Sequence, residues 1–368
     1  MLPKIYILVD QPFETGIGKF ALELCRALTK RKQPCTIIYN GYSHLEINNG
    51  DVEIFDIGKK LPNEKFLIFV PFYRKLNSLH LLLERKKYNG SLVHFVGTDY
   101  SLLKFFDFTI ATIHDIRFEN PFNALKYKNK FKLFMDTFFR DIVNLKLFMD
   151  LRWAKNVVSI SQKTSNDLLR RTSINSEIIY HWINRDRFHP RDKNKCLNVL
   201  NLRSDLHYIL NVGNGTLNKN EYIIKQIADK IPENFRIIKI GSYIRHDKII
   251  NVGTVPEESY HLYFNCSDFY ITVSMEEGFN RPIIESMGSG IPIIAPDTPL
   301  YRDLLGDAGI YFNPSLNADD IVELINSIDE EQRLLFSEKV LLRADFFSED
   351  ALINKYINIY KAVLNYCL

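Results

Sequence analysis

Two carboxylates stand eight positions apart in a stretch punctuated by Gly and Pro, SMEEGFNRPIIESMGSGIP, at residues 274–292. Glu277 follows an apolar run, and Glu285 falls in the first turn of a short helix that Pro282 is suited to open. Carboxylates only accept hydrogen bonds, and the hydroxyls of a sugar or a ribose are fitting donors. Capping of a helix dipole accounts for Glu285 but not for Glu277. The residues between the acids would offer backbone N–H donors to the same ligand: Gly278, Phe279 and Asn280.

Three other turns carry residues that suit a charged or hydroxylated ligand. In TGIGKFALEL, Gly16 and Gly18 open a helix after an apolar run, where backbone N–H groups can approach a phosphate, although a plain tight turn serves equally well. In NVGNGTLNKN, Lys219 follows a Gly-rich loop, which suits a pyrophosphate unless the Lys is only solvated. In TIHDI, His114 ends a strand and could donate to a sugar or phosphate oxygen, or simply bind Asp115 or the backbone.

The elements that must hold these turns are short apolar runs alternating with longer amphipathic stretches. The runs are almost continuously apolar, as expected for parallel strands buried on both faces. The pattern predicts an α/β fold of two Rossmann-like doubly wound domains that face each other across a cleft. The predicted strands are 4–9, 35–39, 66–72, 92–97, 109–114, 156–160, 208–213, 236–241, 248–253, 268–274 and 291–295, and the predicted helices include 18–32, 219–231, 256–266 and 317–328.

The predicted domain borders fall at polar segments. Residues 1–183 form the first domain and 184–345 the second, with the charged, Pro-containing NRDRFHPRDKN as the linker between them. Residues 346–368 contain an amphipathic helix, which we expect to pack back on the first domain. A length of 368 residues suits two domains of ordinary size.

Composition narrows the class of protein further. Hydrophobic residues make up 46% and charged residues 25%, which is typical of a folded globular protein. No run approaches the roughly 20 apolar residues of a membrane span, and the first residues do not resemble a secretory signal. The five scattered cysteines predict free thiols in a reducing compartment, and no metal site is expected.

Charge divides unevenly between the two halves of the chain. Residues 1–190 carry 29 Lys and Arg against 19 Asp and Glu, a net of +10, and residues 191–368 carry 18 against 25, a net of −7. A basic first half suits an anionic ligand or surface, unless the charges are only solvated. Nucleic-acid binding is disfavoured because the second half is acidic and no stacking platform is visible. A nicotinamide site is disfavoured as well, since no acid ends the second strand.

The stretch from Glu277 to Glu285 resembles the E-x7-E motif of retaining glycosyltransferases of the GT-B fold, family 4, also described as glycosyl transferases group 1. Its surroundings, DFYITVSMEEGFNRPIIESMGSGIPIIAPD, are similar to the family pattern, and this is the most specific of the matches. Weaker matches follow in the family's order over nearly the whole chain: TGIGKFALEL, TIHDI, VSISQKTSNDLL and NVGNGTLNKN.

The resemblance implies a role for each matching residue. Glu285 would hold the nucleotide ribose, Glu277 the hydroxyls of the donor sugar, and His114 the sugar near the reacting carbon. Lys219 would bind the diphosphate and stabilise the leaving group, and the loop at Gly16 and Gly18 would approach phosphates and acceptor. In NVGTVPEESY the base pocket would be lined by Thr254 and Val255. No metal or other cofactor is expected, and neither acid is assigned as a nucleophile.

Two positions depart from the family pattern. Asn214 stands where an Arg is usual, so that only Lys219 remains of a basic pair. Asn280 and Arg281 stand where Gly and Leu are usual, and we expect Arg281 to supply the missing cation. The departure at Asn214 keeps open the possibility of a non-catalytic protein of the same fold that binds a nucleotide or a glycan. A GT-B phosphorylase or epimerase is a further alternative.

The expected function is therefore transfer of a sugar from a GDP- or UDP-linked donor to a glycan, a lipid-linked molecule or another hydroxyl acceptor. Residues 102–150 mix Lys with aromatic residues and carry much of the basic excess. They could sit on an anionic lipid surface, or form a helix that packs its apolar face on the sheet. We expect a cytoplasmic protein, and the first reading would place it at the inner face of a membrane.

Overall fold

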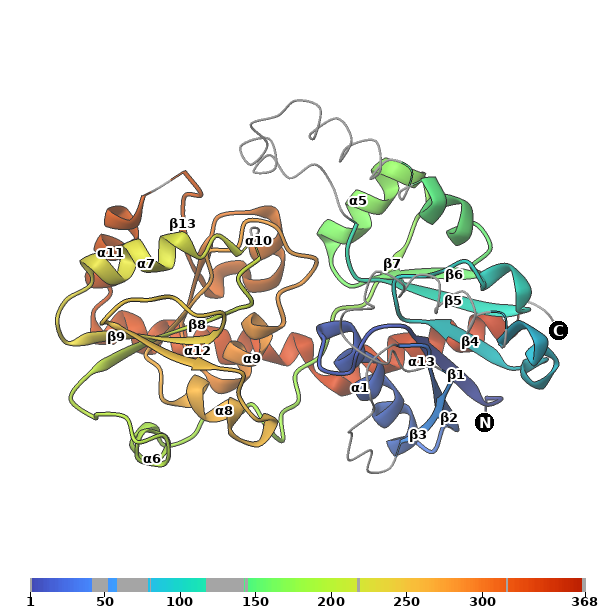
Figure 1. Ribbon diagram of the computed structural model, residues 1–368, viewed down its shortest axis with the longest axis horizontal. Coiled ribbons are helices and arrows are strands. Elements are labelled where there is room, and N and C mark those ends of the chain that lie inside the picture. The colour runs from blue at the N-terminus through green and yellow to red at the C-terminus, as the bar shows by residue number, and fades with distance from the viewer. Residues whose placement is uncertain are drawn as a thin grey trace. The chain divides into compact units, whose positions relative to one another are not determined.

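The computed structural model describes residues 2–41, 52–57, 79, 81–116, 142, 145–216, 219–315 and 317–365. These residues divide into two compact units. Unit 1 comprises residues 1–181 together with 350–368, and unit 2 comprises residues 182–349. Each unit is a sheet of parallel strands with helices packed against it, which confirms the predicted α/β fold (Figure 1). The strand predicted at 66–72 lies outside the described residues.

The described part of unit 1 contains a sheet of seven strands in the order β3-β2-β1-β4-β5-β6-β7. All neighbouring strands pair in parallel, and β2 and β4 are buried along their whole length. The strands are β1 (Ile5–Val9), β2 (Cys35–Tyr39), β3 (Glu53–Asp56), β4 (Leu92–Phe95), β5 (Phe108–Ile113), β6 (Asn156–Ser159) and β7 (Glu177–Ile178).

Helix α1 (Gly16–Lys30) follows β1 directly, and its first turn explains one of the two glycines there. The hydroxyl oxygen of Thr15 caps the helix by accepting from the N–H of Gly18 at 3.1 Å. A Cβ on Gly18 would lie 2.1 Å from the carbonyl oxygen of Pro12, so the loop can fold over the helix only without a side chain. Among the described residues of unit 1, the other helices with defined bounds are α5 (Gln162–Thr172) and α13 (Glu349–Asn365), with short 3-10 turns η2 (Arg85–Tyr88) and η3 (Leu103–Phe105).

A buried histidine joins the last helix of the chain to the middle of the first sheet. His94 on β4 has no exposed surface. Its Nδ1 lies 2.9 Å from the hydroxyl of Tyr360 on α13, and its Nε2 lies 2.7 Å from Oγ1 of Thr112 on β5. Both ring nitrogens are therefore partnered within unit 1. Residues from opposite ends of the chain thus share one core.

Within the described residues, the sheet of unit 2 has six strands in the order β10-β9-β8-β11-β12-β13. They are β8 (His207–Gly213), β9 (Phe235–Gly241), β10 (Ile249–Gly253), β11 (Phe269–Ile271), β12 (Ile293–Pro296) and β13 (Gly309–Phe312). The helices are α6 (Lys193–Val199), α7 (Tyr222–Lys230), α8 (Glu257–Asn265), α9 (Arg281–Ser289), α10 (Pro299–Leu305), α11 (Ala318–Ser327) and α12 (Glu330–Ala344), with 3-10 turns η5 (Gly306–Ala308) and η6 (Asp345–Phe347).

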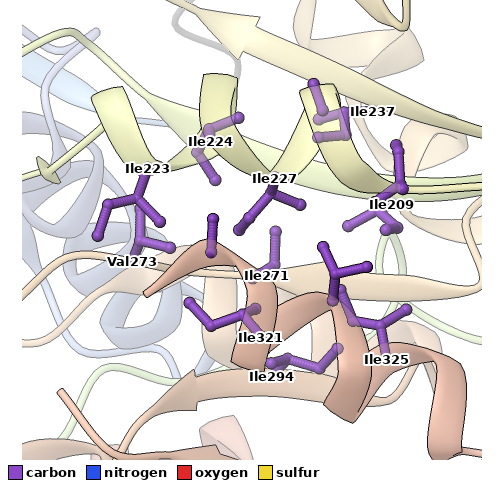
Figure 2. Close-up of a cluster of buried hydrophobic side chains, with 14 of the residues drawn as sticks. Ile209, Ile223, Ile224, Ile227, Ile237, Ile271, Val273, Ile294, Ile321 and Ile325 are labelled. Carbon is purple, nitrogen blue, oxygen red and sulfur yellow. The ribbon is translucent and has the colours of Figure 1, made fainter. Parts of the chain in front are cut away.

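One hydrophobic cluster in the core of unit 2 is built mostly of isoleucine. Figure 2 shows Ile223 and Ile227 of α7 and Ile321 of α11 pointing toward strand residues such as Ile209 and Ile271, all in one buried cluster. Helices α7 and α11 therefore cover the same face of the sheet. Because β-branched residues fit a pleated surface and resist helix formation only mildly, one residue type serves both layers.

The ends of unit 2 lie beside each other. Ile183 forms a parallel bridge with Ser348, and its N–H donates to the carbonyl oxygen of Phe347 at 2.9 Å. A salt bridge between Arg185 and Asp345 at 2.9 Å also joins the two ends of unit 2. Unit 2 therefore begins and ends at a single place.

Three strands were not predicted from the sequence: β3, β7 and β13. They are two to four residues long. Strand β3 also contains two acids and is largely exposed, so it lacks the apolar run that marks the inner strands. The side chain of Glu53 is instead bound to Lys4 and Thr36. Short edge strands of this kind are specified by their neighbours more than by their own residues.

Within the part of the chain that the structure describes, no helix is both long and apolar enough to cross a bilayer. The described cysteines, Cys25, Cys35, Cys196 and Cys266, are free and buried.

Burial lowers the pKa of His94 to about 3, with a smaller contribution from the neighbouring His114. An unfolded histidine titrates near pH 6.5, so between about pH 6.5 and 3 the unfolded chain binds a proton that the folded chain does not. The free energy of unfolding should therefore fall as the pH falls through this window, by up to ~1.4 kcal/mol per pH unit from His94 alone. Urea denaturation at pH 7 and pH 4.5 measures this slope.

His94→Gln removes the titrating imidazole and should flatten that slope. Parallel pH curves for the wild type and His94→Gln would show that His94 does not contribute to acid sensitivity.

Candidate functional site

The predicted residues of unit 2 follow the carboxyl ends of its parallel strands. Loops after β8, β10 and β11 carry Lys219, Thr254 and Glu277. The carboxyl ends of parallel strands lie at one edge of a sheet, where open α/β folds bind their ligands. The fold of unit 2 therefore collects residues from distant parts of the sequence at the same edge.

Lys219 and Glu277 are in direct contact. Nζ of Lys219 lies 2.5 Å from Oε1 of Glu277, and both side chains are mostly buried. The same carboxylate oxygen accepts from the hydroxyl of Ser274 at 2.7 Å. The residue predicted to bind phosphate and the residue predicted to bind sugar thus form a salt bridge with each other. Ser274, which follows β11, holds the carboxylate of this pair. The sequence placed each on its own loop without indicating that they meet.

Glu285, which is predicted to bind the ribose of a ligand, is buried, with 8% of its surface exposed. It lies in helix α9, and its Oε2 accepts from the hydroxyl of Tyr260 on α8 at 3.2 Å. Burial and the adjacent Glu285 carboxylate raise the pKa of Tyr260, so this hydroxyl stays protonated and can donate. Nε of Arg281, one turn earlier, lies 4.0 Å from Oε1 of Glu285. The carboxylate is thereby oriented from two sides.

Asn280 explains how the chain enters α9. Its φ of 69° is left-handed, a conformation that Gly and Asn adopt at low cost. Its buried side chain donates from Nδ2 to Oγ1 of Thr272 at 3.2 Å and to the hydroxyl of Tyr301 at 3.1 Å. Asn in place of the family's usual Gly therefore keeps the turn and adds two buried hydrogen bonds that tie the motif to the sheet.

The neighbours of Asn280 are also set by packing. The ring of Phe279 is buried and meets the ring of Phe347 edge-on at 6.3 Å. Gly278 lies between Phe279 and Glu277 in the loop that carries the acid. On the far end of α9, a Cβ at Gly288 would lie 2.8 Å from the carbonyl oxygen of Phe188, so the helix packs directly on the first residues of unit 2.

The loop after β8 is shaped by its own polar groups. Oδ1 of Asn214 accepts from the hydroxyl of Thr216 at 2.9 Å, a local turn of the kind Asn favours. Asn214 is exposed. Where the family usually has a charged Arg, this chain therefore has an uncharged polar residue that stabilises the turn. Gly215 has a φ of 78°, which suits glycine.

Beneath this loop lies a charged pair that the sequence analysis did not identify. Lys239 on β9 has no exposed surface, and its Nζ lies 3.0 Å from Oε1 of Glu221, which precedes α7. The available signal was a single Lys inside the apolar run RIIKIG. A lysine in a strand buried on both faces requires a partner.

Thr254 and Val255 follow β10 after Gly253, whose φ of 70° turns the chain at the strand end. Thr254 is exposed and Val255 is half-buried. They therefore lie at the same edge of the sheet as the motif residues, and their role in a base pocket stays a prediction.

The remaining predicted residues belong to unit 1. His114 follows β5, is largely buried, and its ring lies 5.3 Å from that of Phe20 and 5.5 Å from that of His181. Gly16 begins α1, and the N–H of Gly18 is bound to the Thr15 cap. The helix cap thus already uses one of the N–H groups predicted to approach a phosphate.

Among the described residues, no group of three or more His, Cys, Asp or Glu side chains could hold a metal ion. The arrangement in unit 2 instead combines a lysine, two oriented carboxylates and a helix that starts at the motif. Such a set can bind an anion through Lys219 and hydroxyl groups through Glu277 and Glu285.

Comparisons with known proteins agree with the motif. Residues 192–339 match the family model described as Glycosyl transferases group 1, which confirms the resemblance to that group over this part of the chain. O-antigen chain mannosyltransferase B of Escherichia coli is 23% identical over 381 residues, covering 94% of this chain and 96% of that protein.

Solved structures agree with the fold. Sucrose-phosphate synthase of Thermosynechococcus elongatus matches with a TM-score of 0.77 at 16% identity, covering 98% of this chain and 99% of that chain. HepE of Anabaena, in complex with UDP and glucose, matches with a TM-score of 0.74 at 13% identity, covering 98% and 100%. The two-sheet architecture is the GT-B fold.

Replacing Asn280 should separate the cost of its backbone from that of its side chain. Asn280→Ala loses two buried hydrogen bonds and places a Cβ-bearing, non-polar residue at positive φ, which should lower the free energy of unfolding by roughly 2–4 kcal/mol. Asn280→Gly loses the same hydrogen bonds but relieves the backbone, and should cost about 1 kcal/mol less. Urea denaturation of the two variants measures the difference, and equal costs would rule out backbone strain at this position.

Proposed function

We propose that this chain, whose residues 192–339 match the glycosyl transferases group 1 model and whose fold is GT-B, is a retaining glycosyltransferase that uses a nucleotide-diphosphate sugar. The sugar moves from a GDP- or UDP-linked donor to a hydroxyl of a glycan or of a lipid-linked acceptor. The observation that carries this proposal is the contact between Lys219 and Glu277 at the edge of the sheet, beside the helix that holds Glu285.

The contact suits a ligand that has both an anion and hydroxyl groups. A diphosphate would take the place of Glu277 as the counter-ion of Lys219. The released carboxylate would then accept hydrogen bonds from the sugar hydroxyls, while Glu285 accepts from the ribose. One ligand with phosphate and hydroxyls in sequence therefore satisfies all three side chains together, which neither a free sugar nor an inorganic phosphate can do.

The same groups serve the reaction. When the bond between the anomeric carbon and the phosphate oxygen breaks, its electron pair stays with the diphosphate, and the sugar carbon becomes electron-poor. Lys219 stabilises the charge on the leaving diphosphate, with Arg281 as the proposed second cation. The acceptor hydroxyl attacks the sugar carbon and passes its proton to the oxygen of the leaving diphosphate. Retention of configuration is part of the proposal, and neither Glu277 nor Glu285 is assigned as a nucleophile.

His114 of unit 1 is proposed to contact the donor sugar near its reacting carbon, and the α1 loop at Gly16 and Gly18 to approach the phosphates and acceptor. Thr254 and Val255 are proposed to line the base pocket. The reaction as proposed uses no metal and no further cofactor. Support for a nucleotide donor comes from the similar structure that contains UDP and glucose. Support for glycan synthesis comes from the similar O-antigen mannosyltransferase.

A thermal-shift panel of UDP, GDP and sugars linked to each tests the proposal. A ligand at 100 times its Kd adds about 2.7 kcal/mol of stability, a shift of roughly 5–11 °C in the unfolding midpoint of a unit of this size. One base family should stabilise the wild type, and Glu285→Ala should abolish the shift because the ribose loses its acceptor. Absence of any shift at millimolar concentration, together with no sugar transfer, would contradict the proposed function.

Removing the acid or the base of the Lys219–Glu277 salt bridge should change the affinity for a nucleoside diphosphate in opposite directions. Glu277→Gln removes the competitor for Lys219, so the stabilising nucleoside diphosphate should bind roughly fivefold more tightly, although transfer is lost. Lys219→Met and Arg281→Ala should each weaken it roughly tenfold. Calorimetric Kd values separate these cases, and tighter binding to Lys219→Met than to the wild type would exclude a phosphate role for Lys219.

We further propose that unit 1 contacts an anionic membrane surface, which would place a lipid-linked acceptor near the protein. Much of the basic stretch predicted for this role, residues 117–141, lies outside the described residues. Its last part continues as helical residues 145–151. Along this helix and the turn after it, three large apolar side chains recur every four residues with half or more of their surface exposed: Leu145 58%, Met149 52% and Trp153 50%. Exposed cations accompany them: Lys146, Arg152 and Lys155.

An exposed apolar stripe beside cations fits the boundary of an anionic bilayer. In flotation assays, the protein should bind vesicles that contain phosphatidylglycerol and not vesicles of phosphatidylcholine alone. The triple change Leu145→Ser, Met149→Ser, Trp153→Ser should abolish binding. A matched control removes three exposed leucines from α12 and should have no effect: Leu334→Ser, Leu335→Ser and Leu342→Ser. Binding to neither vesicle would refute the membrane proposal.

A further inference from the structure

The ammonium of Lys239 is enclosed within unit 2 and has three acceptors around it. Its Nζ lies 2.8 Å from the carbonyl oxygen of Gly213, 3.0 Å from that of Ile240 and 3.0 Å from Oε1 of Glu221. An ammonium has three N–H donors, so this set matches its hydrogen-bonding capacity. Lys239 therefore acts on the protein around it and not on a ligand.

The partner carboxylate reaches the loop that carries Lys219. Oε1 of Glu221 accepts from the N–H of Gly215 at 3.1 Å, and Oε2 accepts from the hydroxyl of Ser242. Burial alone would raise the pKa of Glu221, but the hydrogen bonds from Ser242 and Lys239 outweigh it and hold the pKa below its usual value. The carboxylate thus stays charged and bound on both oxygens.

The backbone around the pair leaves room for it. A Cβ at Gly213 would lie 2.3 Å from Oε1 of Glu221, so only glycine lets the carboxylate pass under the strand end. A Cβ at Gly241, whose φ is 101°, would lie 1.9 Å from the carbonyl oxygen of Gly213. Both strand ends are therefore built to place Glu221 and Lys239 beneath the turn.

Stability alone accounts poorly for this arrangement. Desolvation of two charges costs several kcal/mol per ion, and well-packed apolar residues commonly replace a buried ion pair without loss. Burial lowers the pKa of Lys239, the bond to Glu221 raises it, and the charge of Lys219 lowers it further. The pair thus lies within the electrostatic reach of the side chain assigned to the diphosphate.

The pair joins both ends of the turn that carries Lys219. At the start, Lys239 binds the carbonyl of Gly213 and Glu221 binds the N–H of Gly215. At the end, Glu221 itself lies two residues after Lys219 in the chain. Because both ends of the turn are held, the backbone position of Lys219, and with it the position of its side chain, is restricted.

We propose that the buried Lys239–Glu221 pair is a positioning device that sets Lys219 for the diphosphate of the donor. The inference rests on the proposed function, since it assigns Lys219 to a diphosphate. Lys239 and Glu221 are positioning residues and touch no ligand. Their effect should appear in the affinity for phosphate-bearing ligands and not in the affinity for the nucleoside alone.

Three variants and one control test the proposal: Lys239→Met, Glu221→Gln, the double variant with both changes, and Lys225→Gln on the exposed side of α7. Lys239→Met leaves a buried carboxylate without its cation and should lower the unfolding midpoint. The double variant removes both charges and should regain most of that loss. Calorimetry at 15 °C then measures binding of UDP and GDP, and NMR titration measures binding of uridine and guanosine.

In the double variant, the nucleoside diphosphate that the wild type prefers should bind at least tenfold more weakly, while the matching nucleoside binds as in the wild type. Lys225→Gln should change neither affinity. Wild-type affinity for the diphosphate in a folded double variant would overturn the positioning role, and so would an equal loss for nucleoside and diphosphate. If the wild type itself binds neither UDP nor GDP, the proposed function fails and the inference fails with it.

Discussion

Parallel strands buried on both faces leave polar chemistry only one place to occur, the edge where the strands end. In unit 2, isoleucines from strands and helices fill one face of the sheet, and the strands between them carry little that is polar. The loops at the carboxyl edge of the sheet are not enclosed by this core, so they can carry polar and charged residues. Lys219, Glu277 and the entry to α9 all lie there. The position of the candidate site thus follows from how the core of each unit excludes water.

Charges at such an edge lie partly out of water and must be partnered, and the partners define the site. Lys219 is paired with Glu277, Glu285 is held by Tyr260, and Lys239 is enclosed with Glu221. The first pair is accessible enough for a ligand to exchange with it, whereas the last has no exposed lysine surface. The accessible Lys219–Glu277 pair can therefore open to bind a ligand, whereas the buried Lys239–Glu221 pair supports the edge rigidly.

The sequence predicted the features that depend on local pattern. The inner strands of both sheets appear as apolar runs, and the loop–helix that carries both acids of the motif lies where Pro282 indicates a helix start. The sequence could not predict contacts between distant segments, such as Lys219 with Glu277. It also could not show that Lys239 belongs to the support of a loop, because one lysine in a strand is compatible with an edge position or a buried pair. The left-handed backbone at Asn280 is visible only once the turn into α9 is known.

Unit 2 is an insertion within unit 1, and the bridge between Ile183 and Ser348 joins the two ends of the inserted segment. On the ribosome, all of unit 2 emerges as one continuous segment, whereas unit 1 starts first and finishes last. Until α13 leaves the exit tunnel, His94 lacks the hydroxyl of Tyr360, and the first core remains open on one side. The order of synthesis and the order of completion are therefore reversed, and the half-built unit 1 is the stage at which a nascent chain most needs protection from aggregation.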